Sequence, residues 1–315
     1  MGSFFIGGRS ATVATAEPVE MAPALHGPVR HFAQAGDYEI GQIYAQVMLP
    51  AEPISPHPVL LWHGGGMTGA AWETTPDGRP GWAHRFLAAG YDICVSDAVE
   101  RGRASFPPPA LVEGKPVFRP KAEAWETFRI GPAQSYATDP GSRRPHAGQR
   151  FPVASFDALC CQFVARWPAL QPLALEAYAA LVESFDGAVI VAHSQGGGYA
   201  LETALAHPDH VRALVLIEPS GAPPPGKLSA SHNLSELAGI PHLFVWGDFF
   251  AGDTLWQVYR QNVEAYADVL RDRGGRIDSL DLPAMGTKGN SHLLMMDDNS
   301  DAVFGMVAEW LKAQI

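Results

Sequence analysis

The sequence has few cysteines, with Cys94, Cys160 and Cys161 as its three among 315 residues. A small, odd number argues against a disulfide framework and is typical of a reducing compartment. Cys94 lies in an apolar run, which indicates a buried thiol. Cys160 and Cys161 have no further Cys or His at ligand spacing, so we expect no metal site there.

Positive charge and long apolar runs are also scarce. Lys and Arg number 22 against 33 Asp and Glu, which gives a net charge of −11, and no basic run occurs. Nucleic acid requires clustered cations, so we expect no such partner.

No stretch approaches the roughly 20 apolar residues of a membrane span, and residues 1–10 lack a signal-peptide pattern. We expect a soluble, cytoplasmic protein; a leader removed from the sequence is the alternative.

Short apolar runs alternate with helical patterns along most of the chain. Residues 38–49 alternate apolar and polar side chains, which predicts an antiparallel strand with one wet face. Continuous apolar runs, typical of parallel strands buried on both faces, occur at 58–66, 91–99, 188–194, 211–219 and 241–248, with a last strand expected at 276–282. Helices are expected at 82–90, around 155–185, and at 196–208, 253–273 and 301–313. This order predicts an α/β fold, a mostly parallel central sheet with helices on both faces, in one domain of residues 1–315.

Residues 100–154 interrupt this alternation. They are rich in Pro, Arg and aromatic residues and show little periodicity. A long irregular segment inside a compact domain is usually functional or disordered, and this one follows a strand's C-terminal end, where α/β folds bind ligands. We interpret it, with the helix that returns to the sheet, as a lid or pocket wall at 100–185; a solvated loop is the alternative. Its aromatic residues could also serve a homodimer.

The segment AHSQG at 192–196 predicts a nucleophile. A nucleophile elbow places a serine on a strained turn between a strand and a helix, with small residues two positions to either side. Ser194 follows a predicted strand and precedes a predicted helix, and Ala192 and Gly196 are the small flanking residues. The alternative is a serine that only caps the helix.

A serine hydroxyl needs a base to take its proton. In folds of this kind the base follows the last strand, and the acid lies between serine and base in the chain. His292, chosen by position among twelve histidines, fits the base. Glu218 and Asp248 both close predicted strands; we favour Glu218, because its strand is almost wholly apolar and a charge there needs a partner such as the imidazole.

The tetrahedral oxyanion of acyl transfer needs hydrogen-bond donors. The backbone N–H of Gln195, the residue after the nucleophile, predicts one donor. The glycine loop HGGG at 63–66 predicts the second, for which we favour Gly65, with Gly66 or Met67 as alternatives.

Together these residues resemble a small group of bacterial α/β-hydrolase carboxylesterases, the group of the Alcaligenes esterase. The matching blocks are GSFFIGGR (2–9), GQIYAQVMLP (41–50), WETTPDGRPGW (72–82), RGRAS (101–105), HSQ (193–195), IEP (217–219) and GNSH (289–292). The resemblance implies a Ser-His-Glu triad with Glu218 as the acid, and oxyanion donors at Gly65 and Gln195. The predicted lid and the loop at 220–238 depart from the group's pattern, so its substrate preference does not carry over.

We therefore expect a serine carboxylic-ester hydrolase that acts through an acyl-enzyme on a small or medium ester. A lactonase, thioesterase or acyltransferase would use the same residues, and a non-catalytic ligand-binding protein is a more distant alternative. The chemistry requires no metal or organic cofactor. Candidates for the pocket lining, each of which could instead pack in the core, are Gly66, Trp72, Trp125, Phe128 and Phe249.

Overall fold

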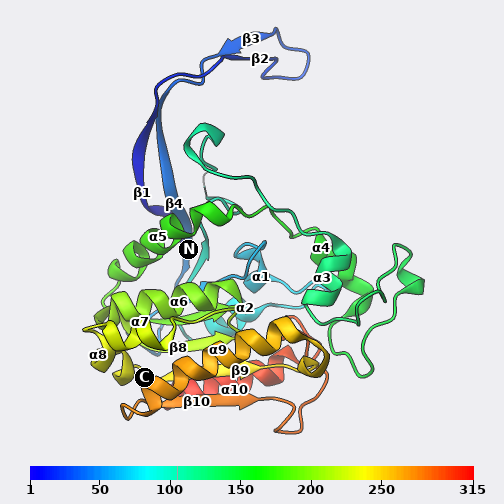
Figure 1. The fold of residues 1–315 in the computed structure, drawn as a ribbon, viewed down its shortest axis with the longest axis vertical. Helices are drawn as coiled ribbons and strands as arrows, with labels where there is room; N and C mark the ends of the chain where they lie inside the picture. Colours follow the sequence, from blue (N-terminus) through cyan, green and yellow to red (C-terminus); the bar gives the residue numbers. More distant parts are fainter. Residues whose placement is uncertain (105) are drawn as a thin grey trace.

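A computed structural model of the protein describes residues 1–104 and 106–315. Ser105, part of the RGRAS segment and of the predicted lid, lies outside the described residues. An eight-stranded sheet runs through the molecule in the order β1-β4-β6-β5-β7-β8-β9-β10 (Figure 1). Its strands are β1 (Gly2–Val13), β4 (Gly36–Met48), β5 (Val59–Trp62), β6 (Ile93–Asp97), β7 (Ala188–His193), β8 (Val211–Ile217), β9 (His242–Trp246) and β10 (Ile277–Asp281).

The sheet is mostly parallel, as the sequence predicts. The six strands from β6 across to β10 pair in parallel with their neighbours, and only β1 and β4 at one edge pair antiparallel. The carboxyl ends of the parallel strands therefore meet at one edge, and loops that follow different strands can converge there.

Side chains of each inner strand enter two hydrophobic clusters, one on each face of the sheet. Along β5, Leu60 and Trp62 belong to one cluster, whereas Val59 and Leu61 belong to the other. Because both faces are buried, these strands are predominantly apolar. The first cluster is covered by α5 (Gln171–Glu183), α6 (Gln195–Ala206), α7 (Pro225–Ala230), α8 (Leu234–Gly239) and α9 (Thr254–Arg271). The second is covered by α1 (Ala70–Glu73), α2 (Trp82–Ala88), α3 (Lys121–Thr127), α4 (Phe156–Cys160) and α10 (Ser300–Lys312).

The N-terminal segment forms a long hairpin that the sequence only half predicts. Strand β4 was expected, but β1 was not, because most of its residues are exposed and it lacks an apolar face. The far end of the hairpin carries a second small sheet, β2 (Val19–Met21) with β3 (Arg30–Phe32), and stands away from the body (Figure 1). Gly7 has φ +73°, and a Cβ there would lie 2.8 Å from Ala177 Cα, so only glycine lets β1 cross α5 this closely.

The irregular segment contains short helices, and the helix expected around 155–185 is divided. Its two parts, α4 and α5, are separated by a connector with Pro168, and Trp167 before that proline is extended (φ −113°, ψ 102°). A proline disfavours helical backbone at the residue before it, which explains the break. Helix α5 packs against β1, β4 and α6, so the last part of the predicted 100–185 lid belongs to the helix layer. In the described part of the chain, no helix combines the length and apolarity of a bilayer span.

The stack of Trp62 on Tyr178 ties β5 to α5, and both side chains are fully buried, with ring centroids 3.9 Å apart. Trp62→Ala should lower the free energy of unfolding by about 3–5 kcal/mol, because it leaves a cavity beneath the helix layer. Urea denaturation measures this. Phe118→Ala is the control, since Phe118 is 71% exposed and its loss should change stability by no more than about 0.5 kcal/mol. Equal losses for the two variants would contradict the prediction.

Candidate active site

Ser194 lies on the sharp turn between β7 and α6. Its backbone has φ +54° and ψ −117°, a strained conformation for a residue with a side chain. A Cβ at Gly196 would lie 2.6 Å from the carbonyl oxygen of His63, so the turn fits only glycine there. Ala192 is fully buried. The strand, turn and helix thus form the elbow that the AHSQG segment predicts.

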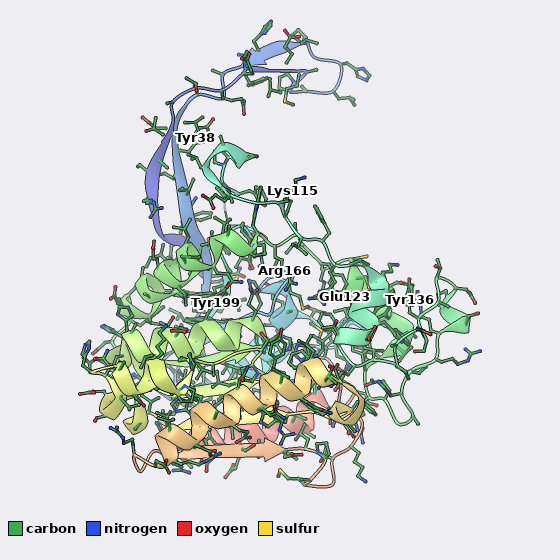
Figure 2. All side chains as sticks on the ribbon, in the orientation of Figure 1. Tyr38, Lys115, Glu123, Tyr136, Arg166 and Tyr199 are labelled. Atoms are coloured by element: carbon green, nitrogen blue, oxygen red, sulfur yellow. The ribbon has the colours of Figure 1, made fainter. Side chains whose placement is uncertain are left out.

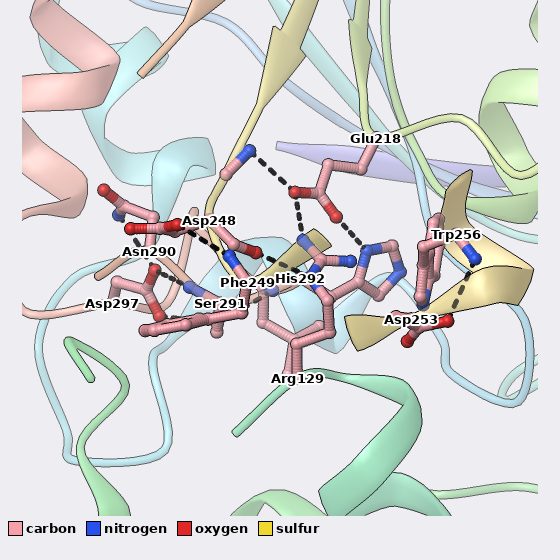
Figure 3. Close-up of polar contacts among 12 residues, drawn as sticks. Arg129, Glu218, Asp248, Phe249, Asp253, Trp256, Asn290, Ser291, His292 and Asp297 are labelled. Carbon is pink, nitrogen blue, oxygen red and sulfur yellow. Dashed lines mark hydrogen bonds and ion pairs between the residues drawn. The ribbon is translucent and has the colours of Figure 1, made fainter. Parts of the chain in front are cut away.

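His292 and Glu218 meet at the carboxyl edge of the sheet. Glu218 follows β8, His292 lies on the loop after β10, and His292 Nδ1 is 2.6 Å from Glu218 Oε2, with both side chains buried (Figure 3). An imidazole nitrogen bonded to a carboxylate carries a proton, so Nε2 presents a lone pair. Among the described residues Nε2 has no hydrogen-bond partner, and His292 lines the same cavity as Ser194.

The second oxygen of Glu218 is held by two further donors. Oε1 accepts hydrogen bonds from Arg129 Nη2, at 2.5 Å, and from the backbone N–H of Gly247, at 2.7 Å. The ion pair is almost free of solvent, with side-chain exposures of 1% for Arg129 and 0% for Glu218. A buried carboxylate requires such compensation. Sequence reasoning missed Arg129, because nothing distinguishes it from the other arginines of the irregular segment.

Asp248, the alternative acid, has a different set of partners. Its carboxylate accepts hydrogen bonds from the backbone N–H groups of Phe249 (2.7 Å) and Gly289 (2.9 Å). These bonds stabilise the turn after β9 and its contact with the loop that carries His292. The imidazole faces Glu218 instead, so the geometry favours Glu218 over Asp248.

The surroundings of His292 are apolar and positively charged. Its ring centroid lies 4.0 Å from that of Trp256 and 5.6 Å from that of Phe128. Burial, then the positive charges of Arg129 and Arg119, hold the pKa of His292 well below its ordinary value of 6.5. The imidazole is therefore neutral at pH 7, the form that a general base needs. Trp256 was not predicted, since its position in α9 resembles that of any core residue.

The loop that carries His292 is fixed by a second buried carboxylate. Asp297 accepts hydrogen bonds from Ser291 N (2.8 Å), Ser291 Oγ (2.7 Å) and Asn290 Nδ2 (2.9 Å). Burial raises the pKa of Asp297 to about 7. The loop also contacts the elbow, where the ring nitrogen His193 Nε2 lies 2.9 Å from the carbonyl oxygen of His292. These contacts hold the loop of His292 against the elbow.

The glycine loop after β5 lies directly against the elbow. Its shape is held by His63, whose Nε2 accepts from Ala98 N (3.0 Å), so that Nδ1 donates to Gly64 O (2.9 Å). A Cβ at Gly64 would lie 3.1 Å from Ser194 Cβ, so the loop approaches the serine closely. Met67, one alternative oxyanion donor, already directs its N–H to Gly64 O (3.4 Å).

A cavity of about 490 Å³ opens between the elbow, the glycine loop and the irregular segment. Of the predicted residues, Ser194, His292, Gly65, Gln195 and Phe128 line it. The lining residues that sequence reasoning missed include Arg119, Glu123, Arg166, Tyr199, Trp256 and Tyr259. Within the described residues, no three His, Cys, Asp or Glu side chains converge as a set of metal ligands would.

Four predicted pocket residues lie outside this cavity. Gly66 lines a smaller neighbouring one of about 140 Å³. Trp72 and Trp125 are fully buried and pack in the core, against Trp82 and Phe156 respectively. Phe249 stacks on His146, with ring centroids 4.4 Å apart, and lines a different cavity. Core and pocket aromatics look alike in a sequence, which explains why only Phe128 of the four aromatic candidates lines this cavity.

Residues 184–282 match a family model described as the alpha/beta hydrolase fold. A solved structure described as that of a novel bacterial esterase superposes with a TM-score of 0.83 and 30% sequence identity, covering 99% of this chain and 95% of that one. A fungal protein (Fungal sp.) named as a probable secreted lipase is 26% identical over 340 residues, 90% of this chain and 89% of its own.

The two carboxylates differ in their contact with the imidazole, so their removal should differ in effect. Glu218→Gln should lower kcat about 10³- to 10⁴-fold, because the amide cannot stabilise the imidazolium. Asp248→Asn should lower it by less than about tenfold. Hydrolysis of p-nitrophenyl butyrate measures kcat, and near-UV circular dichroism checks that both variants fold. The opposite ranking would assign the acid to Asp248.

The depressed pKa of His292 predicts the acid limb of the pH profile. Because only the neutral imidazole accepts a proton, kcat/KM should stay high as the pH falls to 6.5 and decline only below it. Arg119→Gln removes a positive charge that lowers this pKa, so the limb should move to higher pH. Lys121→Gln, at an exposed ion pair with Asp157, is the control and should leave it in place. An unchanged limb in Arg119→Gln would contradict the electrostatic cause.

Proposed function

Because the chain belongs to the esterase family of the α/β-hydrolase fold, we propose that this hydrolase cleaves carboxylic esters through an acyl-enzyme on Ser194. The observation that carries the proposal is the buried bond between His292 Nδ1 and Glu218. It leaves His292 Nε2 as the proton acceptor, in a cavity that Ser194 also lines. This arrangement supports a mechanism in which an ester carbonyl in the cavity reaches both Ser194 and His292.

In the first half of the reaction, Ser194 Oγ attacks the ester carbonyl and its proton passes to His292 Nε2. The imidazolium that forms is stabilised through Nδ1–H by the charge of Glu218. The carbonyl oxygen becomes an oxyanion, which accepts hydrogen bonds from the backbone N–H groups of Gly65 and Gln195. The intermediate then collapses, His292 returns its proton to the alkoxide, and the alcohol leaves an acyl group on Ser194.

In the second half, His292 takes a proton from water, and the hydroxide attacks the acyl carbon. The same two N–H groups hold the second oxyanion. Collapse breaks the bond to Ser194 Oγ, which recovers the proton from His292, and the carboxylic acid leaves. The cavity volume of about 490 Å³ lies in the range of small-ligand sites, which supports a small or medium ester.

The cellular compartment in which the protein works is a separate proposal. The free thiols of Cys94, Cys160 and Cys161 suit the reducing cytoplasm, which we retain as the proposed location. The fungal relative, in contrast, carries the word secreted in its name. Fractionation of the source cells, with detection of the protein by antibody, separates the two.

Labelling with a fluorescent alkyl fluorophosphonate tests the proposed chemistry directly. The reagent should modify Ser194 alone, as peptide mapping by mass spectrometry would establish, and labelling should abolish the release of p-nitrophenol from p-nitrophenyl butyrate. The structural reason is that only a serine beside a neutral base is activated for attack. Ser194→Ala should show neither labelling nor turnover.

Matched controls distinguish the proposed function from its rivals. Ser220→Ala removes another cavity-lining serine, and it should label like the wild type. Product analysis in the presence of competing alcohols and thiols distinguishes hydrolysis from acyl transfer, since an acyltransferase would form the new ester or thioester. A folded wild-type protein that neither labels nor turns over any ester would refute a serine esterase.

A further inference from the structure

The cavity beside Ser194 is lined by charged side chains, and all but one of them have partners. Glu123 bonds Arg119 at 2.6 Å and accepts a hydrogen bond from Thr127 Oγ1 at 3.1 Å. Glu202, on α6, pairs with Lys227. Both lining carboxylates are therefore neutralised by cations of the protein itself.

Arg166 is the exception. Its guanidinium lines the cavity, and in the described ranges no carboxylate lies within ion-pair distance of it. The nearby Glu100 is taken by Arg101 Nε and by the backbone N–H of Trp167. In Figure 2, Arg166 is labelled between Tyr199 and Glu123, the side chains that line the cavity from α6 and α3. Once Glu123 is paired with Arg119 and Glu202 with Lys227, which lies outside the lining, the charge of Arg166 is left without a counterion.

The guanidinium is close to the site of the proposed reaction. A Cβ built on Gly65 would lie 3.2 Å from Arg166 Nη1 and 3.1 Å from Gln195 Oε1, so the guanidinium lies beside Gly65, one of the two proposed oxyanion donors, on the side that the Gln195 side chain also approaches. Its backbone is fixed, because its N–H and C=O both bond Val117, at 3.0 and 2.8 Å. The charge is thus held at the glycine loop, in the cavity that Ser194 also lines.

We propose that Arg166 binds a carboxylate on the substrate, so that the enzyme prefers esters that carry a negative charge near the scissile bond. This inference rests on the proposed esterase function. An arginine side chain presents a planar fork of donors that suits a carboxylate. A charge left without a counterion in a partly desolvated cavity attracts an anion more strongly than one in open water. The substrate supplies the missing partner, on its acyl or its alcohol part.

Two matched ester pairs test this preference. p-Nitrophenyl hemiglutarate and its methyl ester differ in a carboxylate on the acyl part, and 4-acetoxybenzoate and its methyl ester differ in one on the alcohol part. For each pair, the ratio of kcat/KM for the charged ester to that for the neutral ester cancels any general loss of activity. Arg166→Gln should lower this ratio roughly tenfold in at least one pair, mainly through KM. The pair that responds identifies which part of the ester faces Arg166.

Two further variants serve as controls. Arg166→Lys keeps the charge without the fork, so it should restore part of the ratio. The double variant Arg119→Gln/Glu123→Gln removes a cation and an anion together and should change the ratio by less than about twofold. Ratios unchanged by Arg166→Gln in both pairs, while the wild type hydrolyses the neutral esters, would overturn the anion site and leave the esterase proposal intact.

A binding measurement separates this inference from catalysis. Titration calorimetry of monomethyl glutarate and of 4-acetoxybenzoate compares Ser194→Ala with Ser194→Ala/Arg166→Gln, neither of which turns over. The second variant should bind at least one of them roughly tenfold more weakly. Equal affinities would overturn the anion site. Ser194→Ala/Arg166→Gln could bind more weakly while the wild-type protein neither hydrolyses esters nor labels at Ser194. That result would support the anion site and refute the esterase.

Discussion

The carboxylate of Glu218 is the constraint on which the site depends. It is fully buried, at the end of a strand with apolar faces, and a bare charge there would destabilise the fold. Three donors compensate it: His292 Nδ1, Arg129 Nη2 and the backbone N–H of Gly247. They come from the last loop, the irregular segment and the end of β9. One buried charge thereby draws three distant parts of the chain to the edge of the sheet.

This arrangement makes residues 127–129 of the irregular segment part of the candidate site. Beyond the ion pair of Arg129, the carbonyl oxygen of Phe128 accepts a hydrogen bond from the N–H of His292 at 3.0 Å, and that of Thr127 accepts one from Trp256 Nε1 at 2.7 Å. Moving residues 127–129 would expose the charge of Glu218 and release the imidazole. Residues 127–129 are therefore held in place, and Thr127 and Phe128 form a rigid part of the cavity lining. The backbone of the site is strained, since Ser194, Glu218 and Arg129 all have positive φ.

The sequence by itself determined the fold class, the position of Ser194 on a strand-turn-helix, and the order of the candidate serine, acid and base along the chain. These features are local or periodic. Predominantly apolar runs of four to seven residues indicate strands buried on both faces, and small residues around Ser194 are required by the turn itself. The choice between Glu218 and Asp248 could be ranked but not made, because both end a strand at the same edge of the sheet.

Only the tertiary structure decided what surrounds these residues. Arg129, Trp256 and Arg166 have no local pattern that distinguishes them, because their roles arise from contacts with residues 36 to 101 positions away along the chain. The sequence predicts Trp72 and Trp125 at the pocket, whereas both pack in the core. The cause is the same, because an aromatic side chain has the same sequence signature in either place. A charge or ring acquires its role from what packs against it, and that packing is set by the whole fold.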